Sequence, residues 1–251
     1  MRDNMAGVTP LKYLHLYLPV FVLVWVGLYL DSAEFAQRVP YNQWLANIAV
    51  MPVFFWLYFH SPRYLKEMML FGLFVAILGE TLFSLILGMY TYRLENIPLY
   101  IFFGHSIIYG GVYYLAKEPF LRQKSRALIK ILFVSAMSYA FLWLLFADDL
   151  FGFLCTVALA LLLRKYKRPR LFFLLMYFTV AYLELVGTHY GCWSWPDVWF
   201  DVVTFIPSAN PPSGIGFFYF LFDAGCLWFY KKANKRRWQR LRAVQKSVYQ
   251  P

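Results

Sequence analysis

The stretch that decides the fold is EMMLFGLFVAILGETLFSLILGMYTYRLENIP, residues 67–98. Residues 67–88 form a mostly apolar run that is long enough for a transmembrane helix, which needs roughly 20 residues to cross a bilayer. The run ends at Gly88, after which come two tyrosines one residue apart, a short polar turn and a proline. The sequence therefore predicts a transmembrane helix followed by a segment, residues 88–98, that we call the first hinge.

Apolar runs of similar length recur along the chain and give about eight predicted spans: 11–30, 44–60, 67–88, 98–116, 129–147, 149–163, 171–187 and 214–230. Of 251 residues, 61% are hydrophobic and only 15% are charged, which lies outside the usual composition of soluble domains. The first run is too long for the apolar part of a secretory signal, so we expect it to be retained. Whether 149–163 crosses completely stays open. The predicted class is an all-α polytopic membrane protein with about eight transmembrane helices.

The basic residues predict the orientation of these spans. With eight spans, both termini and alternate loops share one side, which holds 22 of the 24 Lys and Arg residues; the other side has Arg38 and Arg93. The positive-inside rule then places both termini in the cytoplasm, in a multi-pass protein of the cytoplasmic (inner) membrane. The basic tail, residues 233–251, is expected to bind membrane lipids rather than nucleic acid. Asp148 and Asp149 lie in a very short outer turn and are expected to be solvated.

The first hinge has a counterpart about a hundred residues later, GCWSWPDVWF running on to NPPSGIG, which we call the second hinge, residues 191–212. An acid in the preceding span, a glycine, two aromatics one residue apart, and an Asn and Pro occur in the same order in both. The pairs are Glu80 with Glu184, Gly88 with Gly191, Tyr90 with Trp193, Tyr92 with Trp195, and Asn96 with Asn210. We predict two parallel four-helix repeats, residues 1–117 and 127–232, with both hinges on the outer face.

Ionisable groups inside the predicted spans mark the candidate site, because such groups are costly in hydrocarbon and tend to be functional. At about 1.5 Å per residue, each glutamate lies roughly 10 to 12 Å below its hinge. The predicted catalytic residues are Glu80, His105, Glu184 and Asp223. The predicted substrate-binding residues are Tyr90, Tyr92, Tyr109, Trp193, Trp195, Asn96 and Asn210. The alternative, that these groups only bridge helices, stays open.

These residue types point to acid–base chemistry on a hydrophobic substrate. A carboxyl group in a low-dielectric pocket can stay protonated near neutral pH and protonate a C=C bond. Aromatic faces stabilise the resulting cation. A second carboxylate or His105 can then direct water onto the cation, or remove a proton to give isomerisation or cyclisation. This chemistry requires no cofactor, and no spacing such as H-E-x-x-H predicts a metal site.

Two segments carry a resemblance to a known group: GETLFSLILGMYTYRLENIP, residues 79–98, and LELVGTHYGCWSW, residues 183–195. They resemble the integral-membrane carotenoid hydratases of the bisanhydrobacterioruberin type and, more distantly, the membrane lycopene cyclases, although the chain lacks the Pro-x-Glu-Glu signature of the cyclases. The resemblance implies cofactor-free addition of water to an isoprenoid end group, a lyase reaction of carotenoid biosynthesis.

Two other functions remain compatible with the sequence. The buried acids would also serve a proton-coupled transporter of small molecules or lipids, and parallel repeats fit that function. A non-catalytic membrane subunit would use the same polar layer for helix packing alone. The sequence leaves the substrate and the oligomeric state open.

Overall fold

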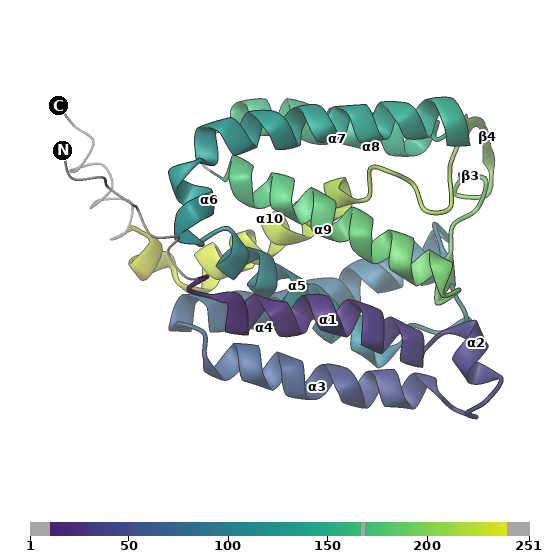
Figure 1. Ribbon diagram of the computed structural model, residues 1–251, viewed down its shortest axis with the longest axis horizontal. Helices are drawn as coiled ribbons and strands as arrows, with labels where there is room; N and C mark the ends of the chain where they lie inside the picture. The colour runs from purple at the N-terminus through teal and green to yellow at the C-terminus, as the bar shows by residue number, and fades with distance from the viewer. Residues whose placement is uncertain (1–10, 167–168, 240–251) are drawn as a thin grey trace, which may run out of the picture.

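The structure, a computed structural model, describes residues 11–166 and 169–239, so residues 240–251 of the predicted basic tail lie outside it. The described chain is mostly helical (Figure 1). Its long helices are α1 (Leu14–Leu30), α3 (Gln43–Phe59), α4 (Arg63–Glu80), α5 (Leu99–Leu115), α7 (Ser125–Ala147), α8 (Leu150–Lys165), α9 (Arg170–His189) and α10 (Gly216–Ala233). Short helices α2 (Ala33–Ala36) and α6 (Pro119–Gln123) lie at opposite ends of the bundle.

Each predicted span coincides with one of these long helices. Within the described ranges, three helices are long and apolar enough to cross a membrane: α4 with its continuation to Ile86, α7 and α9. Helices α1, α3 and α5 are apolar but shorter. The structure therefore confirms a mostly helical chain that contains helices able to cross a membrane.

The helices form two groups. Helices α1, α3, α4 and α5 pack against one another, α7 packs against α8 and α9, and α10 packs against α8 and α9. The groups meet where α10 packs against α4 and where α9 packs against α1 and α5 (Figure 1). The candidate site lies along this junction.

The two hinges begin in the same backbone conformation. Helix α4 widens into the π-helix η1 (Thr81–Ile86), which ends two residues before Gly88, and α9 ends two residues before Gly191. The two glycines have φ angles of 60° and 65°, in the left-handed region that favours glycine because it has no Cβ. The backbone can therefore turn sharply at each glycine, so that the aromatic pair that follows points toward the interior.

The hinges pair directly with each other. Strand β1 (Thr91–Tyr92) is antiparallel to β2 (Trp193–Ser194), with Tyr92 opposite Trp193. The amide of Arg93 extends the pairing by donating to the carbonyl of Cys192, 2.9 Å away. Backbone segments about a hundred residues apart in sequence thus form one small ladder at this end of the bundle.

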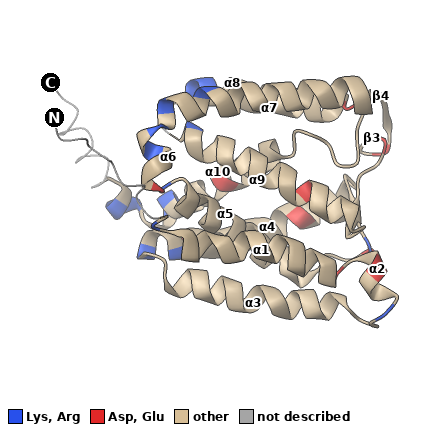
Figure 2. Ribbon diagram, viewed as in Figure 1, with Lys and Arg blue, Asp and Glu red and all other residues tan. Residues whose placement is uncertain are grey.

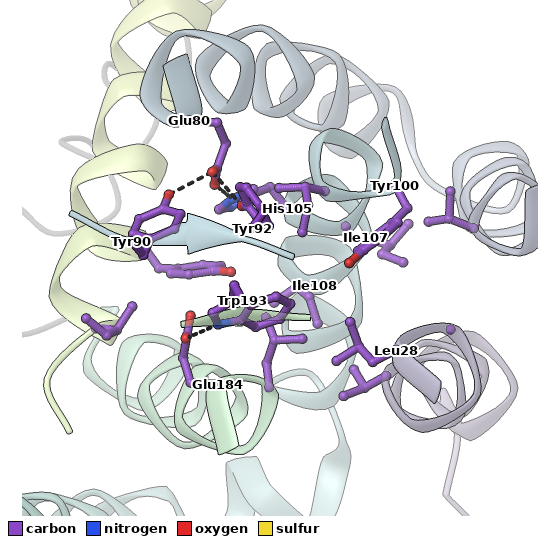
Figure 3. A pocket seen from close by; sticks show the side chains of 18 of the residues that line it. Leu28, Glu80, Tyr90, Tyr92, Tyr100, His105, Ile107, Ile108, Glu184 and Trp193 are labelled. Atoms are coloured by element: carbon purple, nitrogen blue, oxygen red, sulfur yellow. Dashed lines mark hydrogen bonds and ion pairs between the residues drawn. The ribbon is translucent and has the colours of Figure 1, made fainter. Parts of the chain in front are cut away.

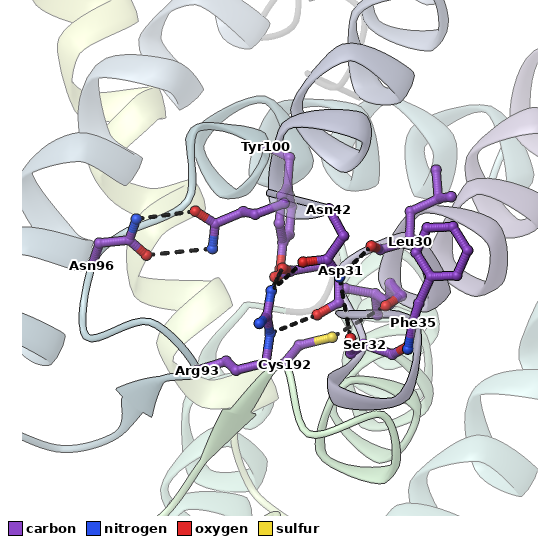
Figure 4. Close-up of polar contacts among 11 residues, drawn as sticks. Leu30, Asp31, Ser32, Phe35, Asn42, Arg93, Asn96, Tyr100 and Cys192 are labelled. Carbon is purple, nitrogen blue, oxygen red and sulfur yellow. Dashed lines mark hydrogen bonds and ion pairs between the residues drawn. The ribbon is translucent and has the colours of Figure 1, made fainter. Parts of the chain in front are cut away.

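A buried ion pair fastens the ladder to the first helix (Figure 4). The Nη2 atom of Arg93 lies 2.6 Å from Oδ1 of Asp31, directly after α1, and 2.9 Å from Oδ1 of Asn42. The hydroxyl of Tyr100 donates to the other Asp31 oxygen at 2.7 Å. Asp31 is wholly buried, so its charge depends on these partners.

The expectation that Asp149 is solvated is wrong, whereas its neighbour Asp148 is exposed. The carboxylate of Asp149 is wholly buried and accepts hydrogen bonds from the backbone amides of Gly152, Ala209 and Ser213. It therefore fixes the end of the second hinge. The second hinge is longer than the first, and its middle part forms a hairpin of β3 (Val198–Trp199) and β4 (Val203–Pro207).

Charge is unevenly distributed along the bundle. Figure 2 shows that most described Lys and Arg residues gather at the end that carries α6, which we call the basic end. The opposite end, which we call the hinge end, carries α2, the hinges and several acidic residues. Glu67 and Glu118 lie at the basic end, whereas Glu80, Glu184 and Asp223 lie within the bundle, where the candidate site is found.

Candidate functional site

A cavity of about 100 Å³ lies beneath the ladder, between the two groups of helices. Most of its wall is apolar and comes from α1, α3, α5 and α10, while its polar groups come from α4, α5, α9 and the two hinges. Figure 3 shows Glu80 and Glu184 approaching from opposite sides, with β1 and β2 between them. A cavity of this size accommodates a small hydrophobic group rather than a whole lipid.

Glu80 is the more strongly bonded of the two acids. The hydroxyls of Tyr90 and Tyr92 each donate to its Oε2 at 2.7 Å, and Nε2 of His105 lies 2.7 Å from its Oε1. Burial and the adjacent Glu80 carboxyl raise the pKa of both hinge tyrosines, which therefore remain protonated donors. Both oxygens of Glu80 are therefore bonded, one to the two phenol hydroxyls and the other to the His105 imidazole.

Glu184 has a different environment. The indole nitrogens of Trp193 and Trp195 donate to its Oε2 at 2.8 and 3.1 Å. Its Oε1 has no hydrogen-bond partner, and no cation pairs with it, among the residues that the structure describes. A buried carboxyl without a cation is favoured in its neutral form, and a neutral carboxyl can donate a proton.

The aromatic rings of the two hinges pack against one another between the two acids. The rings of Tyr90 and Trp195 are 4.6 Å apart between centroids, and those of Tyr92 and Trp193 are 6.1 Å apart. The ring of Trp193 lies directly on Gly187 of α9, where any Cβ would overlap it. The four rings thus separate the acids while leaving both in contact with the same cavity.

The structure brings together most, but not all, of the predicted site residues. The cavity wall includes Glu80, His105, Glu184, Tyr90, Tyr92, Trp193 and Trp195. Asp223 and Tyr109 do not line it and lie deeper, between α4, α5 and α10. Each lies on the same helix face as a residue of the cavity wall and one turn below it, because Asp223 follows Tyr219 and Tyr109 follows His105 by four residues. Their greater depth, rather than the helix face, keeps them out of the wall.

Neither predicted asparagine lines the cavity. The side chain of Asn96 forms a paired amide interaction with Gln43 of α3, with a 3.0 Å bond to its Oε1. The Oδ1 atom of Asn210 accepts from the backbone amide of Trp195 at 3.0 Å. Both asparagines therefore hold the hinges in position.

Sequence reasoning did not select Tyr219 for the site. Its ring stacks on His105 with centroids 4.7 Å apart, and it lines the cavity with Phe218 and Phe222. The signal was present, because Tyr219 precedes Asp223 by four residues and so shares its helix face. These rings form the α10 side of the cavity, next to Glu80 and His105.

Among the described residues, no three His, Cys, Asp or Glu side chains are grouped closely enough to hold a metal ion. No protein-family model, curated protein or solved structure matches this chain. The geometry of the site and the chemistry of its residues therefore carry the functional conclusion.

Proposed function

We propose that this chain is a cofactor-independent enzyme of the cytoplasmic membrane that acts on the C=C bond of a hydrophobic isoprenoid or other lipid substrate. One observation carries the proposal: two buried carboxyl groups with unlike partners, Glu80 and Glu184, face a single apolar cavity. Unequal environments of paired acids are how proteins assign one as acid and the other as base.

In this proposal Glu184 is the acid. Its unbonded Oε1 carries the proton and delivers it to one carbon of the double bond, leaving Glu184 ionised and a carbocation on the substrate. The indole donors on Oε2 stabilise the new carboxylate. The faces of the surrounding aromatic rings stabilise the cation until it reacts.

Glu80 and His105 together form the base. For hydration, a water oxygen bonds to the cation and loses a proton to this pair, giving an alcohol. For isomerisation or cyclisation, the pair instead removes a proton from a neighbouring carbon. In either case one proton enters the substrate from Glu184 and one leaves to Glu80–His105, so no oxidant or reductant is consumed.

Location in the membrane is part of the proposal. All eight long helices would cross as two parallel four-helix repeats, with the basic end in the cytoplasm and the hinge end outside. The shared backbone conformation at Gly88 and Gly191 supports the repeat. Hydration of an isoprenoid end group is the most specific form of the reaction, following the resemblance to carotenoid hydratases.

The test compares lipids and pigments by mass spectrometry in a deletion strain complemented with variants. Glu80→Gln and Glu184→Gln should each reproduce the deletion profile, because an amide can neither donate nor accept the proton. Glu34→Gln, which changes an exposed acid of α2, is the matched control and should restore the parental profile. If both site variants restored that profile while folding normally, the acid–base proposal would be wrong.

A further inference from the structure

A second set of polar side chains lies between the cavity and the basic end. It comprises Asp223 and Tyr230 of α10, Tyr64 of α4 and Tyr109 of α5, and we call it the lower cluster. The rings of Tyr64 and Tyr230 meet edge to face with centroids 4.9 Å apart. Tyr64 and Tyr109 both pack against the buried group that contains Cys226 and Tyr230 of α10.

Two atoms of the lower cluster are buried without a hydrogen-bond partner. They are Oδ2 of Asp223 and the hydroxyl oxygen of Tyr230, two of four such side-chain atoms among the described residues. Leaving a buried polar group unbonded costs about 1–3 kcal/mol. Proteins usually satisfy such groups with bound water. Two of them in one cluster point to water at this place.

The lower cluster is connected to the cavity at its upper side. Tyr219, which stacks on His105, lies one helical turn before Asp223 on the same face of α10. Tyr109 lies one turn after His105 on α5. The helix therefore places a hydroxyl of the cavity wall directly above the carboxyl of the cluster.

The lower side of the cluster reaches the basic end. Tyr230 precedes Lys231, and the nearby Asn234 donates to Oε2 of Glu67 at 2.8 Å. From Tyr219 to Tyr230, α10 rises roughly 16 Å at 1.5 Å per residue. The titratable groups along this stripe are Tyr219, Asp223, Cys226 and Tyr230 on α10, Tyr64 and Glu67 on α4, and Tyr109 and Tyr113 on α5.

We propose that the lower cluster binds water and carries protons between the basic end and the acids of the cavity, with Asp223 as the exchange group. A proton from water at the basic end binds the Asp223 carboxylate. Asp223 then releases it through bound water to the Tyr219 hydroxyl, which passes its own proton to the ionised Glu184 across the cavity that both residues line. Each hydroxyl gains one proton and gives one up, and the reverse order removes a proton from the cavity.

This route would restore the protonation states of Glu80 and Glu184 between turnovers, so its purpose rests on the proposed function. Its existence can be measured without substrate. Infrared spectroscopy of the purified protein in nanodiscs follows the carboxyl bands of the cavity acids after transfer from H₂O to D₂O. The bands are assigned as those lost in Glu80→Gln and Glu184→Gln, and they shift as deuterium replaces the protons on and around these acids.

Asp223→Asn and Tyr230→Phe keep the shape of the cluster and should each slow this shift on the order of tenfold or more, because a positioned proton-transfer group typically contributes at least that much to a rate. Tyr114→Phe removes a buried hydroxyl outside the stripe and should leave the rate unchanged. Thermal unfolding should show all three variants folded.

A parental exchange rate in Asp223→Asn would overturn the proposal, since the cavity acids would then exchange protons by another path. A parental rate in Tyr230→Phe would also overturn it, because protons would then not arrive from the basic end. Slow exchange in both variants, combined with parental lipids in Glu184→Gln, would keep the route and reject the enzyme. The two proposals therefore fail separately.

Discussion

Replacing Arg93 with Met should loosen the ladder that joins the two hinges. Arg93 donates to the Asp31 carboxylate, to the Asp31 carbonyl and to Asn42, and its own amide bonds to Cys192 of the second hinge. Methionine keeps an unbranched apolar stem but removes the charge and every side-chain donor. Asp31 would then retain only the Tyr100 hydroxyl as a side-chain donor.

The expected loss of unfolding free energy is about 3–5 kcal/mol, because removing one partner of a buried ion pair leaves the other charge uncompensated. That is a large fraction of the roughly 5–15 kcal/mol that keeps a typical protein folded. The double variant Asp31→Asn/Arg93→Met should lose less than Arg93→Met alone. It buries no charge, and asparagine can still accept the Tyr100 hydroxyl bond.

Denaturant unfolding of the protein in mixed micelles, followed by circular dichroism, measures these differences. Arg38→Met is the matched control, because Arg38 pairs with Glu34 on the exposed surface and such pairs contribute at most about 1 kcal/mol. Equal losses in Arg93→Met and Arg38→Met, or a greater loss in the double variant than in Arg93→Met, would refute the reasoning.

Two other substitutions test the cavity and the residues that support it separately. Gly104 of α5 lines the cavity, and a Cβ there would meet nothing within 4 Å. Gly104→Leu should therefore fill the cavity, leave the unfolding temperature unchanged and reproduce the lipid profile of Glu184→Gln; a parental lipid profile would mean that substrate does not enter this space. Asp149→Ala should lower the unfolding free energy by about 3 kcal/mol or more in denaturant titration, because three backbone amides lose their acceptor. The control Asp148→Ala, at an exposed side chain, should change it by less than about 0.5 kcal/mol. Similar effects of the two variants would contradict the structural role of Asp149.

The helices were predictable because their signal is local. Apolar runs such as 67–88 report length and burial directly, and the recurring order of Glu, Gly and paired aromatics indicated where both acids lie. Depth along a helix follows from residue count alone, so Glu80, His105 and Glu184 could be placed at one level beneath the hinges.

What could not be predicted depends on the extent of the cavity and on long-range pairing. Asp223 shares a face of α10 with Tyr219, but the cavity wall includes Tyr219 and Phe222 and does not reach Asp223 one turn deeper. The burial of Asp149 follows from amides contributed by residues 209 and 213, some sixty positions away. The pairing of Tyr92 with Trp193 likewise depends on how the two helix groups meet, which no local pattern in either segment encodes.

The ladder between β1 and β2 also constrains how the molecule can move. Rocking of one helix group against the other, as in alternating access, would have to shear backbone hydrogen bonds that cross the junction and break the Arg93–Cys192 contact. A bundle whose two helix groups are hydrogen-bonded to each other at one end opens most easily by lateral separation of neighbouring helices. In the proposed function, a long-chain substrate would then enter between the helices, end first, while the hinge end stays closed.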